Sequence, residues 1–230
     1  MSFTYLLLNI LIIAIPLGLT FDKRIAYYRR LPAIVFSIAV VSSFFLVWDG
    51  IVTARGEWSF NGKYLTGLQL LNIPLEEILF FITVPFSCLF IYEVVLYTTK
   101  SCDIKLPARA VIGAIIILLV ILLVASLALR HQGYTSKALA SCGFFLVAAW
   151  VFDRSLLNSK QYWLWLGVCY IPFLLFNSVL TALPVVQYNP SAIFGVRVFT
   201  IPIEDFLYNF AMLSFYVFLY RMRRKPLADC

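Results

Sequence analysis

Charged side chains are scarce in this chain. Asp, Glu, Lys and Arg together make up 13% of its 230 residues, against about a quarter in a typical soluble domain. Hydrophobic residues make up 63%, which is more than a water-soluble fold can cover with so few charges. We therefore expect the apolar excess to face lipid. The composition excludes a large aqueous catalytic domain, a nucleotide-binding domain and a DNA-binding module.

The residues that usually build metal and cofactor sites are also missing. A single histidine, His131, excludes a multi-histidine metal site, and the five cysteines include no C-x-x-C pair. No G-x-G-x-x-G motif predicts a dinucleotide site. The chain lacks a D-x-x-x-D cluster for magnesium diphosphate, and its last apolar segment has no lysine for a retinal Schiff base. The remaining option is acid–base chemistry on an apolar molecule, without metal or cofactor.

Long apolar runs, by contrast, fill most of the sequence. A membrane-spanning helix needs about 20 apolar residues, and seven segments fit, at about 2–20, 32–50, 73–97, 107–129, 135–153, 162–180 and 200–220. The first segment lacks a basic leading region and a small-residue cleavage site, so we interpret it as a retained span. The sequence predicts an all-α integral membrane protein with seven transmembrane helices.

Basic residues gather on one side of these segments. Most of the 18 Lys and Arg residues lie after the first, third and fifth segments and in the C-terminal tail. Positive residues flank membrane spans mainly on the cytoplasmic side. We therefore expect a multi-pass protein of the cell membrane, with its N-terminus outside and its C-terminus in the cytoplasm. This pattern also explains the net charge of +7 without a nucleic-acid partner.

Two parts of the sequence match when the chain is shifted by 128 residues. The shift places Asp49 on Asn177, and Ile73-Pro74-Leu75-Glu76-Glu77 on Ile201-Pro202-Ile203-Glu204-Asp205. A constant offset across polar residues, prolines and acids is hard to obtain by chance, and it indicates an internal repeat.

The repeat predicts how the seven helices are organised. Residues 1–100 form the first three-helix repeat, 101–134 a linker helix with loops, and 135–230 the second three-helix repeat with the basic tail. Because the linker adds one span, both repeats enter the membrane in the same direction, as parallel rather than inverted repeats. Both acidic motifs therefore open from the same face and can meet in one site.

Four carboxyl groups in these motifs are the main candidates for chemistry: Glu76, Glu77, Glu204 and Asp205. Acids just after a proline, here Pro74 and Pro202, are also a common helix start, because they complement the helix dipole. Two equivalent pairs on spanning helices nevertheless favour a function, since an ionisable group costs about 3 kcal/mol at mid-membrane. Carboxyls brought together in an apolar site can share a proton near neutral pH, providing both a donor and an acceptor.

The duplicated motif resembles the heterodimer-type lycopene cyclase family of bacteria, archaea and fungi. In that family two small subunits, or one fused chain with an extra linking span, cyclise the ends of linear carotenoids. Residues 74–77 and 202–205 fit the family motif P-x-E-[ED], and the 3 + 1 + 3 plan resembles the fused version across nearly the whole chain.

The resemblance implies an isomerase of the lycopene β-cyclase type that converts lycopene to β-carotene without a cofactor. A general acid protonates the terminal double bond, a neighbouring double bond attacks the cation, and a base removes a ring proton, with no net redox change. The resemblance assigns donor and acceptor to the four motif acids but leaves open which is which. We expect Glu76 and Glu204 to matter most, because that position is Glu in both repeats.

Further candidates follow from the same resemblance. Phe80 lies four residues after Glu76 and Tyr208 four after Glu204, so each aromatic shares a helix face with its glutamate and could stabilise a cation. Asp49 and Asn177 are weaker candidates for contacts with substrate or cation. The implied partners are a carotenoid taken from the bilayer, membrane lipids and other carotenoid-pathway enzymes. The ring type (β, ε or γ) stays open.

A small proton-coupled transporter is the main alternative, because some small carriers also have 3 + 1 + 3 parallel repeats. Such carriers tend to carry a Pro-Gln pair in a repeated span, and this sequence has none. Their membrane carboxyls also tend to lie in the middle of a span, whereas the motif acids here lie at its start. Both differences favour the cyclase.

Overall fold

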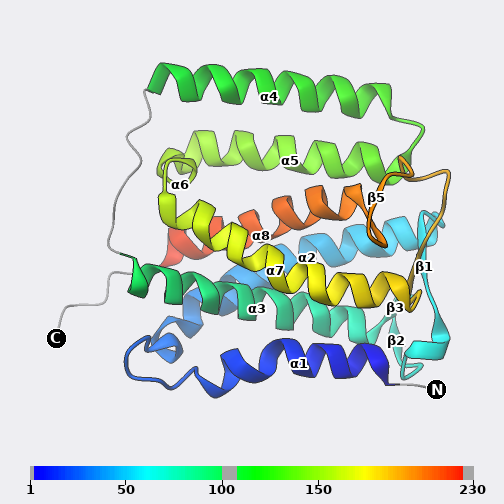
Figure 1. Cartoon of the computed structure of the whole chain (residues 1–230), viewed down its shortest axis with the longest axis horizontal. Coiled ribbons are helices and arrows are strands. Elements are labelled where there is room, and N and C mark those ends of the chain that lie inside the picture. Colours follow the sequence, from blue (N-terminus) through cyan, green and yellow to red (C-terminus); the bar gives the residue numbers. More distant parts are fainter. Residues whose placement is uncertain (1–2, 100–107, 225–230) are drawn as a thin grey trace.

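The computed structural model describes residues 3–99 and 108–224. These residues are mostly helical, and their long helices run roughly side by side (Figure 1). The long helices are α1 (Thr4–Gly18), α2 (Leu31–Ala54), α3 (Leu75–Thr98), α4 (Ala108–Ala128), α5 (Gly133–Phe152), α7 (Lys160–Ala182) and α8 (Ile203–Arg223). Each of them lies at one of the seven apolar segments expected from the sequence. Shorter pieces connect them: η1 (Tyr27–Arg30), η2 (Gly62–Tyr64) and α6 (Arg154–Leu157).

Four helical stretches among the described residues are long and apolar enough to cross a membrane. They are Tyr27–Ala54, Leu75–Thr98, Gly133–Phe152 and Lys160–Ala182. The apolar stretches Thr4–Gly18 and Ile116–Ala128 are shorter. Together with the scarcity of charge, these helices indicate an all-α membrane protein, whereas the crossing of all seven helices stays a prediction.

Short strands at one end of the bundle were not expected from the sequence. Strand β1 (Trp58–Phe60) pairs with β4 (Val186–Tyr188), β2 (Gln69–Leu70) with β3 (Ile73–Pro74), and β5 (Arg197–Val198) with β6 (Ile201–Pro202), all antiparallel. They cluster where α3 and α8 begin (Figure 1). Strands of two or three residues leave no alternating pattern long enough to recognise in a sequence.

Pro74 and Pro202 each end a strand and stand directly before a helix. Both have φ −58° and ψ 144°, so α3 begins at Leu75 and α8 at Ile203. The sequence instead predicted spans from 73 and 200, which run through the short strands. A proline here costs no helical hydrogen bond, because the first-turn N–H groups have no partner within the helix. The prolines thus set the position at which the motif acids enter each helix.

The two halves share the same local backbone at the 128-residue offset. In the first half the Leu75 N–H donates to the Leu68 carbonyl at 2.9 Å, and in the second the Ile203 N–H donates to the Val196 carbonyl at 3.0 Å. Each bond closes the loop that leads into a motif helix. The acidic helices α3 and α8 therefore begin in the same way.

Strands β1 and β4 join the two halves. Trp58 lies opposite Tyr188, and Phe60 lies opposite Val186. At the 128-residue offset, Trp58 is equivalent to Val186 and Phe60 is equivalent to Tyr188. Exchanging the two halves therefore turns the pair Trp58–Tyr188 into the pair Val186–Phe60, which is the other pair of the same ladder. The halves are therefore related by a local two-fold axis at this strand pair, which brings the starts of α3 and α8 to the same end of the molecule.

The two predicted repeats share one core. Helix α3 packs against α7 and α8, and α2 packs against α8, so helices of the first predicted repeat pack against helices of the second. The core contains large buried side chains such as Phe145, Trp165 and Tyr216. Helix α4, within the predicted linker 101–134, packs against α5 at the edge of the bundle (Figure 1).

Candidate active site

A largely apolar cavity of about 120 Å³ lies between the motif helices. Glu77 lines it from α3, Asp205 from α8 and Asp49 from α2. Aromatic side chains make up much of its wall, among them Tyr5, Trp58, Phe80, Tyr134, Tyr188 and Tyr208. Three carboxyl groups among aromatic rings form a site suited to proton transfer on an apolar ligand.

The cavity is elongated along the motif helices. Its lining runs along α3 from Glu77 to Cys88 and along α8 from Asp205 to Leu213. At a rise of about 1.5 Å per residue, these stretches correspond to roughly 12–16 Å of helix. A cavity of this shape suits the end of a linear apolar chain, with the carboxyl groups at one end.

Glu76 and Glu204 are not among the residues that line this cavity. Both are completely buried and bind the loop that precedes their own helix. The Glu76 Oε1 accepts a hydrogen bond from the Thr66 N–H at 2.5 Å, and the Glu204 Oε1 accepts one from the Phe194 N–H at 2.6 Å. Glu204 also accepts from the Thr135 hydroxyl at 2.5 Å.

The two acids of each motif have different surroundings. The first acid of each motif ties down a loop, because first-turn carboxylates readily accept exposed N–H groups. The second acid of each motif, Glu77 or Asp205, is left to face the cavity. The expectation that Glu76 and Glu204 matter most stays a prediction, and their placement away from the cavity lining does not favour it.

Phe80 and Tyr208 do line the cavity, but their partners on the helix face differ from those expected. We paired them with the first acids at a spacing of four residues. The structure places them with Glu77 and Asp205, at a spacing of three, which also puts two side chains on one helix face. The difference arises because the loops hold the first acids on another side.

Asp205 accepts three side-chain hydrogen bonds. The donors are the Tyr134 hydroxyl at 2.7 Å, the Tyr188 hydroxyl at 2.6 Å and the Asn177 amide at 3.0 Å. Several donors aimed at one carboxyl group stabilise its ionised form. Burial and the neighbouring Asp205 charge raise the pKa of Tyr188, on strand β4, well above its usual value, so Tyr188 stays protonated and remains a donor.

Glu77 has fewer donors than Asp205. Among the described residues it accepts one side-chain hydrogen bond, from the Tyr5 hydroxyl to Oε2 at 2.5 Å. The contacts Tyr5–Glu77 and Tyr134–Asp205 are counterparts, since each joins the first helix of a half to the second acid of its motif. The ionised form of Glu77 is therefore less stabilised by hydrogen bonds than that of Asp205.

Asp49 and Asn177 occupy equivalent positions but have different roles. Asn177 donates to Asp205, whereas the Asp49 Oδ1 accepts from the Trp58 Nε1 at 2.8 Å. The Asp49 Oδ2 is buried and has no hydrogen-bond partner among the described residues. The half that contains Glu77 thus holds a second carboxyl where the half that contains Asp205 holds an amide. Repulsion between neighbouring carboxylates favours keeping a proton on that side of the cavity.

Most of the cavity residues were not found from the sequence, among them Tyr5, Trp58, Tyr134 and Tyr188. Tyr5 and Tyr134 stand near the start of the first helix in each half, and a buried tyrosine hydroxyl needs a partner. The sequence therefore held a signal that these two tyrosines bond to polar groups inside the bundle. Trp58 and Tyr188 reach the cavity through the β1–β4 pairing, which no local pattern predicts.

Comparison with known proteins places the chain in a family. The family model described as lycopene cyclase matches residues 2–95 and 131–222. The bifunctional lycopene cyclase/phytoene synthase of Phycomyces blakesleeanus is 45% identical over 58 residues, which cover 24% of this chain and 10% of that protein. No solved structure matches. The family match takes in both halves and both acidic motifs, which confirms the resemblance: the chain belongs to the lycopene cyclase family.

Proposed function

We propose that this protein is a membrane-embedded carotenoid cyclase that closes rings at the ends of lycopene by proton transfer. The observation that carries the proposal is that Glu77 and Asp205, from two equivalent helix starts, line one elongated apolar cavity. An apolar polyene end can enter such a cavity, and the two carboxyl groups can deliver and remove a proton without bulk water.

The hydrogen bonds support a division of roles between the two carboxyl groups. Glu77, with one donor, is the group that retains a proton and acts as the general acid. Asp205, with three donors, is the carboxylate that acts as the base. Glu77 protonates the terminal double bond, the neighbouring double bond attacks the resulting cation to form the ring bond, and Asp205 removes a ring proton. The proton then returns to Glu77 before the next turnover.

The aromatic wall supports a cationic intermediate. Tyr134 lies 4.9 Å from Trp58, 5.9 Å from Tyr188 and 6.2 Å from Tyr208 between ring centroids. Ring faces attract a desolvated cation by about 2 kcal/mol each. The Asp205 carboxylate adds a negative charge to the same wall.

The product of this sequence is an isomer of the substrate, so no redox cofactor takes part. We propose a β-ionone ring, with β-carotene as the product when both ends of lycopene react. Because one cavity receives both acidic motifs, each end group reacts in its own binding event.

The proposed membrane arrangement places all seven long helices across the bilayer, with the N-terminus outside and the C-terminus in the cytoplasm. Basic residues near the end of α8 and after α1 support this orientation. The matching loop geometry of the two halves supports the parallel 3 + 1 + 3 plan. Substrate is then taken from the lipid, where other carotenoid-pathway enzymes release it.

Expression of the whole chain in a lycopene-accumulating bacterium tests this function. We expect new pigments with the mass of lycopene and absorption at shorter wavelength, because ring closure twists the terminal conjugated double bond out of the plane of the polyene. Chromatography with mass detection measures them. Unchanged lycopene in cells that contain folded protein in their membranes would contradict the proposal.

Replacing Glu76 or Glu204 by Gln tests the roles of the first motif acids. Glutamine keeps an oxygen that accepts the loop N–H, although it lacks the acidic proton of a carboxyl group. Because these side chains hold loops and do not line the cavity, we expect most of the cyclase activity to remain. The Glu76→Ala and Glu204→Ala variants leave the loop donors unsatisfied and should lose about 1–3 kcal/mol of stability. Pigment analysis and thermal unfolding measure the two effects. Complete inactivation by Glu76→Gln in a stable protein would make that acid a proton-transfer residue.

A further inference from the structure

A second, polar pocket lies at the opposite end of the bundle from the carboxyl cavity. Its volume is about 540 Å³, and it is bordered by the end of α3, the corner between α6 and α7, and the end of α8. Its lining includes two guanidinium groups and four hydroxyl groups, from Arg221, Arg224, Tyr92, Thr99, Ser155 and Ser159. The guanidinium groups and the Tyr92 hydroxyl suit an anion with several oxygen atoms. The hydroxyls of Thr99, Ser155 and Ser159 already donate to Val95, Asp153 and Gln161.

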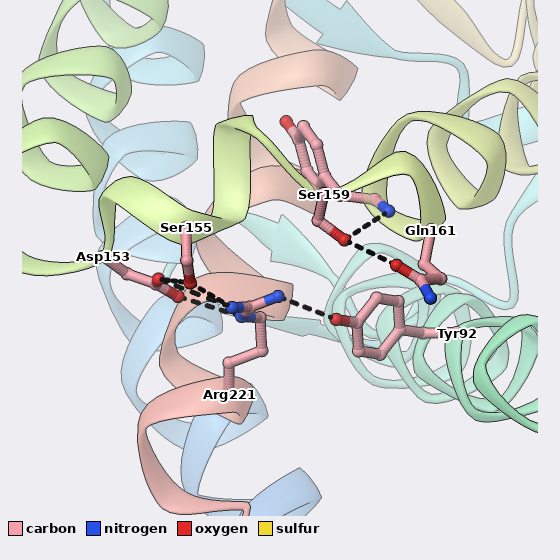
Figure 2. A network of polar contacts seen from close by, with 7 residues as sticks. Tyr92, Asp153, Ser155, Ser159, Gln161 and Arg221 are labelled. Carbon is pink, nitrogen blue, oxygen red and sulfur yellow. Dashed lines mark hydrogen bonds and ion pairs between the residues drawn. The ribbon is translucent and has the colours of Figure 1, made fainter. Parts of the chain in front are cut away.

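Arg221 is held in place by neighbours on several sides. Its Nε donates to the Asp153 Oδ2 at 2.9 Å, its Nη2 to the Ser155 hydroxyl at 2.8 Å, and its Nη1 to the Tyr92 hydroxyl at 3.3 Å. Figure 2 shows the guanidinium between Asp153 and Tyr92, with Ser159 and Gln161 beyond it. A guanidinium fixed in this way loses little freedom when it binds an anion.

Arg224 retains donors for a ligand. Its Nε and Nη2 donate to Glu93 at 2.7 and 3.3 Å, which uses two of the five N–H groups of a guanidinium within the described part of the chain. Glu93 also forms an ion pair with Arg30, while Asp153 pairs with Arg221. Among the described residues that line the pocket, Arg221 and Arg224 are positively charged and none is acidic, so the lining favours an anion.

The pocket lies at the depth of lipid headgroups if the helices span the bilayer. Thr99 follows Glu77 by 22 residues along α3, which corresponds to roughly 33 Å of helix. This is close to the hydrocarbon thickness of a bilayer, about 30 Å. Large apolar side chains near this end are exposed, with Phe152 at 71%, Tyr97 at 61% and Met222 at 58%. Acyl chains can therefore lie beside the pocket.

We propose that this pocket binds the phosphate group of an anionic phospholipid. The guanidinium groups of Arg221 and Arg224 contact the phosphate oxygens, the Tyr92 hydroxyl donates a further hydrogen bond to them, and the acyl chains lie along the exposed apolar side chains. The bound lipid fixes this end of the bundle at headgroup depth. The site does not depend on the proposed cyclase chemistry, since it shares no lining residue with the carboxyl cavity.

The intact protein in detergent provides the first test. Native mass spectrometry with phosphatidylglycerol and phosphatidylcholine of identical acyl chains should reveal one tightly bound phosphatidylglycerol. We expect a preference of about tenfold or more, because two guanidinium groups line the pocket. Inorganic phosphate at millimolar concentration should displace little of it. Equal binding of the two lipids would overturn the proposal. Complete displacement by inorganic phosphate would assign the pocket to free phosphate instead.

Two neighbouring arginines provide a matched pair of variants. Arg224→Gln should weaken phosphatidylglycerol binding about tenfold, the usual effect of losing a charged hydrogen bond. Arg223→Gln removes the same charge from a guanidinium that stacks 4.4 Å from the Phe36 ring and does not line the pocket, so binding should be retained. Equal weakening by both variants would indicate charge alone and overturn the site. If Arg224→Gln fails to fold, two other measurements test the site. They are the lipid preference of the unmodified protein and phosphatidylglycerol binding by Arg224→Lys, which keeps the positive charge.

Discussion

Replacing Glu77 by Gln, or Asp205 by Asn, is expected to lower the rate of lycopene cyclisation by a factor of about 10²–10⁴, the usual contribution of a positioned acid or base. Both substitutions keep the size of the side chain and a hydrogen-bond acceptor for the tyrosine donors. They remove only the ability to deliver or accept a proton at the reacting atoms. Conversion of lycopene by isolated membranes, followed by chromatography, measures the loss.

The matched controls are Glu76→Gln and Glu204→Gln, which make the same chemical change at the neighbouring residue of each motif. They should retain activity, because these side chains bind loop N–H groups rather than line the cavity. Melting temperatures in detergent separate loss of chemistry from loss of fold. Equal activity of Glu77→Gln and the unmodified protein would exclude Glu77 as the acid.

Replacing Glu93 by Ala is expected to reduce the free energy of unfolding by about 3–5 kcal/mol, the typical cost of removing one partner from a buried ion pair. Glu93 is only 5% exposed, and it accepts from the Tyr220 hydroxyl at 2.5 Å and from the Arg224 Nε at 2.7 Å. Arg30 pairs with the same carboxylate at 3.7 Å. The variant therefore takes the negative charge away from two guanidinium groups in a buried setting.

Asp153→Ala offers the comparison at the same end of the bundle. Asp153 pairs with Arg221 but is more exposed than Glu93, so we expect a loss of about 1 kcal/mol, as for a partly solvated pair. Unfolding in detergent, followed by tryptophan fluorescence, measures both variants. A loss for Glu93→Ala no larger than that for Asp153→Ala would mean that the Glu93 cluster does not anchor the fold.

Helix positions were the part of the fold most accessible from the sequence. Apolar runs predicted the range of every long helix within a few residues, because a helix in lipid satisfies its own backbone and shows itself by length and hydropathy. The errors lie at the helix starts. The predicted spans at 73 and 200 ran into strands β3 and β6, where pairing of two residues on each strand outweighs the apolar pattern.

The candidate site was predictable only as a set of residues. The duplicated motif named all four acids, of which Glu77 and Asp205 line the cavity. The predicted residues Phe80, Tyr208, Asp49 and Asn177 line it too. Which acid of each motif faces it could not be predicted, since the choice depends on the loop N–H groups of Thr66 and Phe194.

The sequence by itself indicated a membrane environment, the ranges of the helices and the identity of the acidic motifs. Hydropathy and a repeated motif are local properties of the chain, so they can be read without the fold. Only the tertiary structure decided that Glu77 and Asp205 face one cavity and that Tyr134 and Tyr188 donate to Asp205. It also decided that Arg221 and Arg224 meet in a pocket at the far end. These arrangements depend on hydrogen bonds and packing between segments far apart in the chain, which no local pattern records.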